Sequence, residues 1–379
     1  MTDATYSSAY LRTAPSPAEP PPALVQGPLA WIRTNLFSSP ISAVLTIASV
    51  AFLVWSLPGL VRFLFLDAVW HADSGEACRM HSDGACWPFI YYKFKYFWYG
   101  PYPETQHWRI DLVEGIGAAL IVWLLWTKAP RRGIAAALFF VAYPVLGFIL
   151  LHGAARLGVP IVETSLWGGV LVTLLMSIVG IVFSLPLGVL LALGRRSKLP
   201  IVQATCTGFI ELVRGVPFIT VLFMANFMLP MFLPGDWTPD RLLRPLVGTA
   251  LFAAAYMAEV VRGGLQAMPK GQFEGASAMG LGYWQTMRLV ILPQALTLVI
   301  PGIVSSFISL FKDTTLVSIV GIFDLLRTID SAKNDPVWAA PTTSATGYVF
   351  AAAFYWIFCF GMSRYSQAME RRLRAGRRY

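Results

Sequence analysis

Long unbroken apolar runs dominate this chain of 379 residues. A helix needs about 20 apolar residues to cross the hydrocarbon core of a bilayer. Eight runs approach that length, and they lie near residues 41–64, 110–127, 134–151, 167–194, 218–233, 246–261, 290–310 and 348–362. The sequence therefore predicts an all-α polytopic membrane protein with about eight transmembrane helices.

The composition excludes most other classes of protein. Hydrophobic residues make up 56% of the chain and charged residues only 13%, against about 25% charged in an ordinary soluble domain. This balance rules out a cytosolic globular enzyme, a disordered protein and a disulfide-rich secreted domain. An outer-membrane barrel is disfavoured because its strands alternate polar and apolar residues. Four histidines without an HExxH motif, and four cysteines without a CxxC pair, give no support to a metal site.

The distribution of basic residues predicts the orientation. The net charge is +9, with dense basic clusters in the short connections 128–132 and 195–198. Short basic loops of membrane proteins stay in the cytoplasm. We therefore expect both termini to be cytoplasmic in a multi-pass protein of the bacterial inner membrane, in contact with lipid and not with nucleic acid.

Four regions follow from this pattern. Residues 1–40 are rich in Pro, Ala and Ser and predict a flexible cytoplasmic arm. Residues 41–160 form an N-terminal transmembrane extension, residues 165–365 hold the remaining apolar runs, and residues 366–379 form a basic cytoplasmic tail.

Within the extension, segment 67–109 is a long polar stretch with a high density of Trp, Tyr and Phe. Such a segment suits the membrane–water interface on the periplasmic side, and an aromatic loop packed on the helix bundle is an equal alternative. On that side Cys78 and Cys86 face an oxidising compartment. A disulfide between them and two free thiols are both compatible with the sequence.

The connection 270–293 has an unusual composition for a loop. Glu274 stands alone among small residues, and Pro293 opens the next apolar run. Gly280 and Gly282 are expected to adopt positive φ and so to end a short helix. A helix of small residues allows another surface to approach closely. That surface is either a groove on a partner protein or the bundle of this chain.

This connection resembles the signature EAA loop of ABC importer permeases, with Glu274-Gly275-Ala276, Gly280, Val290 and Leu292-Pro293 at the family's spacing. Gly275 replaces the usual Ala and Val290 the usual Ile. Further strings resemble the polar amino acid uptake branch of that family over residues 165–365: Trp167-Gly168-Gly169 with Thr173-Leu174, Glu211 to Pro217, Ala258-Glu259 with Arg262-Gly263-Gly264, and Lys312-Asp313-Thr314. The added N-terminal spans resemble the longer permease subunit of general L-amino acid importers.

The resemblance implies a five-helix type I importer core that moves L-amino acids by binding-protein-dependent import. A second permease subunit, expected to be a paralogue, completes the pathway, and a periplasmic binding protein delivers the substrate. The loop is expected to dock into a dimer of cytoplasmic ATP-binding subunits through Glu274, Gly275, Ala276, Gly280, Leu281 and Gly282. The chain has no GxxxxGK[ST] motif. We therefore expect it to be no enzyme and to bind no cofactor, with ATP-Mg on the partner ATPase.

Ionisable residues beside the apolar runs are candidates for the substrate pathway, because charges at membrane depth face protein or a water-filled cavity. They are Glu211, Arg214, Glu259, Lys312, Asp313 and Thr314. Glu211 and Arg214 share a helix face and are better explained by a pair that fixes a bend at Pro217. Residues 312–314 alternatively cap the segment that follows them.

Two other functions were weighed against import. An ion-coupled secondary transporter of small polar solutes usually shows internal repeats, which this chain lacks, and it leaves the loop 270–293 unexplained. A membrane-embedded enzyme needs a nucleophile–base pair or metal ligands at membrane depth, and the sequence contains no such arrangement.

Overall fold

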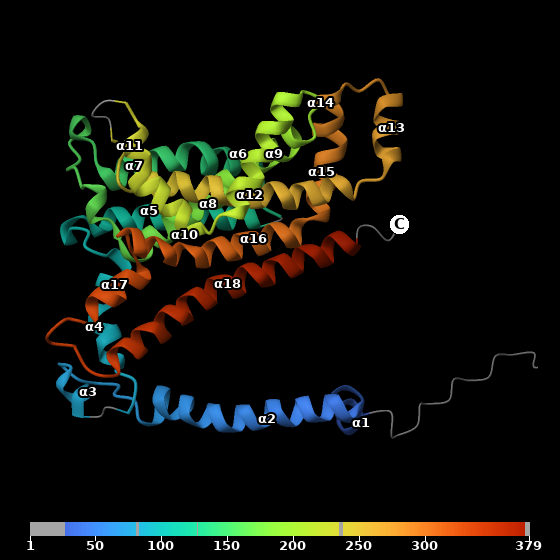
Figure 1. The fold of residues 1–379 in the computed structure, drawn as a ribbon. Coiled ribbons are helices and arrows are strands. Elements are labelled where there is room, and N and C mark those ends of the chain that lie inside the picture. The colour runs from blue at the N-terminus through green and yellow to red at the C-terminus, as the bar shows by residue number, and fades with distance from the viewer. Residues whose placement is uncertain (1–26, 81–82, 127, 235–237, 376–379) are drawn as a thin grey trace, which may run out of the picture. The chain divides into compact units, whose positions relative to one another are not determined.

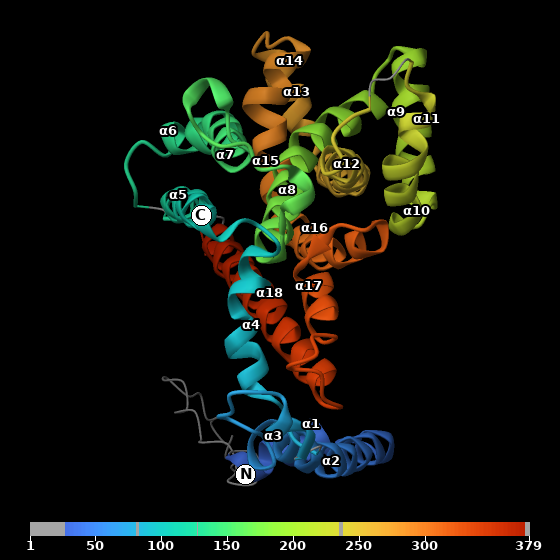
Figure 2. The same cartoon turned by 90° about the vertical axis from the view of Figure 1, so that its left-hand side faces the viewer.

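A computed structural model describes residues 27–80, 83–126, 128–234 and 238–375. The chain divides into two compact units, Met1–Asp67 and Ala68–Tyr379. Both are built from helices, as the sequence predicts (Figures 1 and 2).

The first unit contains helix α1 (Pro28–Leu36) and helix α2 (Pro40–Val61), which a π-helical turn (Arg62–Leu66) extends. The Ser39 hydroxyl caps α2 by accepting a hydrogen bond from the Ser42 N–H at 3.1 Å. Residues 28–36 of the predicted flexible arm are therefore helical, while residues 1–26 lie outside the described residues. No side chain in the apolar window of α2 is buried, so this helix presents apolar surface on all sides.

The second unit contains the remaining elements. Its first part comprises α3 (Glu76–Met80), α4 (Trp87–Tyr99), α5 (His107–Leu125), α6 (Arg132–Ala137) and α7 (Tyr143–His152). Its second part comprises α8 (Gly169–Arg195), α9 (Pro200–Gly215), α10 (Phe218–Phe223), α11 (Leu229–Phe232), α12 (Leu243–Gln266), α13 (Lys270–Ala278), α14 (Tyr283–Gln285), α15 (Leu292–Leu298), α16 (Ile300–Asp313), β1 (Phe323–Asp324), α17 (Leu325–Ala332) and α18 (Thr343–Ala375).

Among the described residues, six helices are long and apolar enough to cross a membrane. A seventh span results if α9 and the α10–α11 segment count as one. The axes of these two parts differ by 109° across the break between Gly215 and Phe218. The predicted run near 110–127 corresponds to α5, which is not among these spans. It carries the charged residues Arg109, Asp111 and Glu114. The predicted number of eight is therefore approximate, and the break at Pro217 is confirmed.

The tightest packing in the second unit lies between α8 and α12, which share its most extensive contact. Glycines of α8 allow this approach. A Cβ atom on Gly188 would lie 2.7 Å from the Met257 side chain, and one on Gly180 would lie 3.3 Å from the Thr249 side chain, both on α12. Small residues at helix interfaces bring backbones close together in membrane bundles, and here they place α8 directly against α12.

The aromatic segment 67–109 packs on the bundle through α4. Phe89 and Phe97 are buried with Leu325 and Ile329 of α17. Polar tips of other α4 residues donate hydrogen bonds to acidic groups on α5: the Trp98 indole donates to Glu114 at 2.9 Å and the Tyr99 hydroxyl to Asp111 at 2.8 Å. Of the two interpretations from sequence, the structure favours the packed one.

A close crossing of three segments joins α4, α8 and β1. Gly100, after α4, has φ +63° and lies against Gly168, and Gly169 has φ +65°. Isolated bridges pair Gly168 with Phe323 and Gly169 with Asp324. A Cβ atom on Gly169 would lie 2.4 Å from the Phe97 carbonyl oxygen. Only glycine combines this backbone conformation with this proximity.

We predict that Gly169→Ala lowers the stability of the protein by at least about 2 kcal/mol, because left-handed backbone and a backbone clash both oppose the added methyl group. The matched control is Gly208→Ala on α9, where no atom lies within 4 Å of the added Cβ and stability should rise slightly. Midpoints of thermal unfolding in detergent compare the two, and equal midpoints would contradict the assignment.

The buried carboxyl group of Asp324 should make the stability of the protein depend on pH. Its side chain caps α17 by accepting from the Leu326 and Arg327 N–H groups, and burial raises the pKa of this carboxyl from 3.8 to about 7. The folded protein therefore binds a proton that the unfolded chain releases, and unfolding free energy should fall as pH rises from about 4 to 7. Asp324→Asn keeps the cap, and the midpoint of its thermal unfolding should change less with pH over this range. An unchanged slope in the variant would contradict the prediction.

Candidate functional site

The loop that follows α12 begins with helix α13 (Lys270–Ala278) and ends it in a defined cap. The Leu281 N–H donates to the Ala276 carbonyl at 3.1 Å, and the Gly280 N–H to the Ser277 carbonyl at 2.9 Å. This pair of bonds is the Schellman arrangement, which places the residue after the helix in left-handed conformation. Gly280 has φ +77°, as the sequence predicts.

Gly282 lies at the start of helix α14, whereas the sequence predicts that it ends α13. Its φ is −68°, an ordinary value, and it precedes α14. The Gln285 side chain accepts from the Gly282 N–H at 3.1 Å, and the Gly282 carbonyl accepts from the Thr286 N–H. The prediction of a positive φ at Gly282 is wrong, because the start of a helix requires extended backbone there.

Helix α13 is fixed to the ends of the neighbouring helices. Ala276 is buried, Phe273 packs on the core formed by α8, α12 and α15, and the Arg196 guanidinium lies 5.9 Å from the Phe273 ring centroid. The opposite side is exposed and includes Glu274, Gly275, Met279, Tyr283 and Trp284. None of the ion pairs among the described residues involves Glu274. The loop is therefore anchored on one face and unpartnered on the other.

Close to this loop, the Glu259 carboxylate on α12 is surrounded by three guanidinium groups. Arg195 at the end of α8 lies 2.7 Å away, Arg262 on α12 lies 2.7 Å away, and Arg214 on α9 lies 3.6 Å away. The Glu259 side chain is only 14% exposed. Because a poorly hydrated carboxylate requires compensating charge, this ionic cluster ties α8, α9 and α12 together.

The pairs within the cluster differ from the simplest expectation from sequence. Glu211 contacts Arg195 at 3.0 Å, and Arg214 turns to Glu259 and to the Tyr256 ring at 5.5 Å. Helical spacing places Glu211 and Arg214 on one face, but tertiary packing supplies each with another partner. Sequence reasoning missed Arg195, although its position in a basic loop directly after a span was a usable signal.

The second group of candidate pathway residues lies at the other end of the unit. Lys312 is exposed, Asp313 is half-buried and Thr314 is buried. The Thr314 hydroxyl donates to the Phe311 carbonyl at 2.8 Å, so it closes the end of α16. The structure does not bring these three residues into contact with the ionic cluster, since the two groups occupy opposite ends of the helices (Figure 1).

Cys78 and Cys86 are joined by a disulfide in the structure, with their Cα atoms 5.7 Å apart. Both cysteines are buried, in the same core as Phe89 and Phe97 of α4. No group of three or more metal-ligating side chains occurs within the described parts of the chain.

A family model described as the inner membrane component of binding-protein-dependent transport systems matches residues 184–375. The chain belongs to this family. The match includes both the loop around α13 and the ionic cluster. As a member of the family, the chain is a multi-pass transport subunit of the inner membrane and not an enzyme, and its core is that of an ABC importer permease.

Curated relatives extend over the whole chain. The inner membrane amino-acid ABC transporter permease protein YhdY of Escherichia coli is 51% identical, covering 92% of this chain and 94% of YhdY. The glutamate/glutamine/aspartate/asparagine transport system permease protein BztC of Rhodobacter capsulatus is 39% identical, covering 98% and 99%. The L-cystine transport system permease protein TcyB of Bacillus subtilis is 32% identical over 90% of its own length but 56% of this chain. The N-terminal extension is therefore shared with the first two and additional to the third.

Removing the central carboxylate tests the ionic cluster. Glu259→Gln leaves three guanidinium groups close together without a carboxylate between them, and we predict a loss of about 1–3 kcal/mol of stability. Glu211→Gln is the matched control, because that side chain is 62% exposed and its single ion pair is worth at most about 1 kcal/mol. Thermal unfolding of the purified protein ranks the two, and a larger loss for Glu211→Gln would contradict the central role of Glu259.

Proposed function

We propose that this chain is one permease subunit of an ATP-driven importer of L-amino acids, coupled to a cytoplasmic ATPase through the loop 270–293. The observation that carries the proposal is the geometry of α13, which is anchored to three helices on one face and exposes small, apolar and acidic residues on the other. The names of YhdY, BztC and TcyB support amino acids as the cargo.

The proposed contact with the ATPase consists of Glu274, Gly275, Gly280, Leu281 and Gly282. Ala276, which the sequence also predicts there, is buried and supports α13 from the anchored face. Exposed Met279 (80%) and Trp284 (68%) add apolar area beside the proposed contact. Exposed aromatic and Met side chains are characteristic of protein interfaces, and the unpaired Glu274 supplies a charge that orients the docked surface. ATP-Mg binds the ATPase dimer in this arrangement, and the chain itself binds no cofactor.

A direct structural route leads from this loop to the transport core. Arg196 contacts Phe273 of α13, and its neighbour Arg195 binds Glu259 and Glu211. A displacement of α13 by the ATPase therefore acts on the end of α8 and on the ionic cluster. We propose that Glu211, Arg214 and Glu259 line the inner end of the substrate pathway and that Lys312, Asp313 and Thr314 lie near its outer end.

The same proposal sets the orientation. With the loop around α13 in the cytoplasm, both termini are cytoplasmic, and α17 and the segment 67–109 are periplasmic. The Cys78–Cys86 bridge then lies in an oxidising compartment, where it stabilises a short loop by about 2 kcal/mol. A paralogous permease, a periplasmic binding protein and the ATPase dimer complete the transporter. An ion-coupled secondary transporter is not favoured, because its mechanism gives the exposed face of α13 no role.

Two variants test the coupling loop. Gly280→Val requires a β-branched residue at φ +77° and should distort the cap of α13, whereas Glu274→Lys reverses the proposed docking charge. Both should lower ATP-dependent uptake of radiolabelled L-amino acids at least tenfold and weaken co-purification of the ATPase. Gly208→Ala on α9 is the control, because it lies outside the proposed contact, its φ is ordinary and an added Cβ there meets no atom within 4 Å.

Uptake is measured in proteoliposomes that contain the assembled complex, with and without ATP and the binding protein. Normal uptake and normal ATPase retention in both coupling variants would exclude this loop as the docking site. Uptake that continues unchanged without ATP would instead exclude the ABC importer mechanism.

A further inference from the structure

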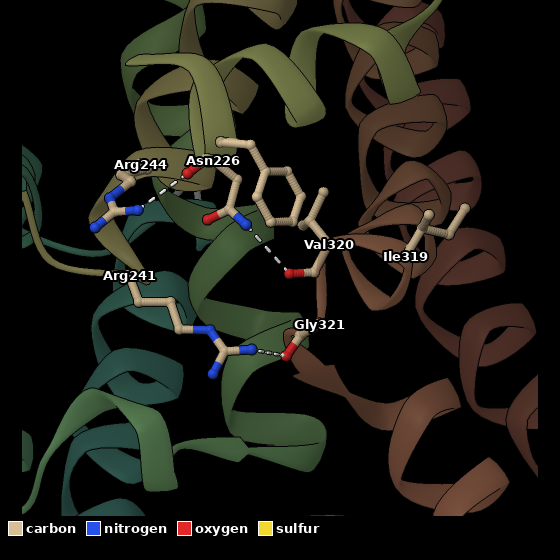
Figure 3. A pocket seen from close by; sticks show the side chains of 7 residues that line it. Asn226, Arg241, Arg244, Ile319, Val320 and Gly321 are labelled. Atoms are coloured by element: carbon tan, nitrogen blue, oxygen red, sulfur yellow. Dashed lines mark hydrogen bonds between the residues drawn. The ribbon is translucent and has the colours of Figure 1, made fainter. Parts of the chain in front are cut away.

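The second unit contains a cavity of about 420 Å³ (Figure 3). The helices that border it, α10, α11 and the start of α12, lie at the end of the unit that is opposite α13 (Figure 1). The volume of the cavity is within the range of sites for small molecules. Three segments form it: the π-helical turn between α10 and α11, the residues at the start of α12, and the turn before β1. The lining consists of Asn226, Phe227, Arg241, Arg244, Ile319, Val320 and Gly321.

Two guanidinium groups border this cavity with most of their donors available. Arg241 donates to the Gly321 carbonyl at 2.7 Å. Arg244 donates to the Pro239 carbonyl at 2.7 Å and to the Asn226 carbonyl at 3.0 Å. A guanidinium has five N–H donors, and both groups bind only neutral carbonyl oxygens. Within the described parts of the chain, no carboxylate lies within 4.0 Å of either one.

The neighbouring acid, Asp240, is committed elsewhere. Its oxygen atoms accept hydrogen bonds from the Thr164 hydroxyl at 2.6 Å and from the Leu242 and Leu243 N–H groups. Asp240 therefore fixes the start of α12 and leaves the adjacent arginines without a carboxylate partner among the described residues. The helix N-terminus at Leu243 adds positive potential to the same place.

The third polar group of the cavity is an unpaired acceptor. Asn226 is 5% exposed, and its side-chain N–H₂ donates to the Val320 carbonyl at 3.3 Å, which fixes the orientation of the amide. The Asn226 Oδ1 atom has no hydrogen-bond partner among the described residues. Figure 3 shows this carboxamide on the same side of the cavity as the two guanidinium groups. A buried acceptor without a donor is unfavourable, so a ligand that carries an N–H donor would complete the site.

We propose that this cavity binds the zwitterionic main-chain group of a free L-amino acid, with the carboxylate on Arg241 and Arg244 and the ammonium group on Asn226 Oδ1. The inference rests on the proposed function and adds a binding site at the outer end of the permease. The remaining walls, Phe227, Ile319 and Val320, carry no further charged side chain. The site therefore recognises the atoms that all amino acids share. An acidic side chain of a docked protein would pair with the arginines but leave Asn226 Oδ1 unpaired.

Gly321 keeps Arg241 in place. Its φ is +81°, and a Cβ atom there would lie 2.7 Å from Arg241 Nη2. The glycine thus allows the guanidinium to lie on the backbone of the turn and to face the cavity from that position.

Saturation-transfer NMR on the assembled transporter in lipid nanodiscs tests the site, without binding protein and without nucleotide. The probes are L-alanine, L-alaninamide, which lacks the carboxylate, and propionate, which lacks the ammonium group. We expect saturable binding of L-alanine and at least tenfold weaker binding of both analogues. Equal binding of propionate and L-alanine would reduce the cavity to a general anion site, and no binding of L-alanine would overturn the proposal outright.

Variants locate the binding. Arg241→Gln and Asn226→Leu should each weaken L-alanine binding at least tenfold, and Asn226→Asp should abolish it by placing a carboxylate beside the arginines. Arg156→Gln, at an exposed arginine elsewhere, is the control. Unchanged binding in Arg241→Gln contradicts the site.

Retention of the ATPase in each preparation separates this inference from the proposed function. A transporter that keeps its ATPase and imports amino acids, but binds no L-alanine in this assay, overturns the cavity assignment alone.

Discussion

The Glu259 carboxylate joins three helices at the end of the bundle that carries the loop around α13. A charge at this depth is costly without partners, and Arg195, Arg214 and Arg262 supply them from α8, α9 and α12. The ends of these helices therefore hold one another in place. Since α13 packs on the same ends through Phe273 and Ala276, the position of the loop depends on this cluster.

The glycines of α8 allow close helix packing along the length of the bundle. In lipid, helices gain little from burying apolar side chains, so close packing and polar contacts hold them together. Gly180 and Gly188 allow α8 to approach its neighbours, and Gly169 allows its first turn to cross the chain at Gly100. A helix held closely along its whole length can carry a displacement from one end to the other, which is what coupling between an ATPase and an outward-facing site requires.

The two ends of the unit thus contain different chemistry. At the α13 end the charges compensate one another and fix structure. At the opposite end Arg241 and Arg244 contact only carbonyl oxygens among the described residues, and Asn226 keeps an unpaired oxygen. Compensated charge stabilises a fold, whereas uncompensated charge beside a cavity favours a ligand. This contrast supports the proposals that the first group links the loop around α13 to the inner end of the pathway and that the second group binds the substrate.

The sequence by itself determined the membrane class, the approximate number of spans, the break at Pro217 and the cap at Gly280, because hydropathy, proline and glycine act locally along the chain. The spacing of Glu274 to Pro293 also singled out the loop around α13, for which we propose the coupling role. Only the tertiary structure decided which arginine meets which glutamate, that α4 packs on the bundle, and that Asn226, Arg241 and Gly321 surround one cavity. These contacts join distant segments, which lie 242 residues apart where α4 meets the turn after α17. No periodicity records them, since they arise when helices pack and turns meet in three dimensions.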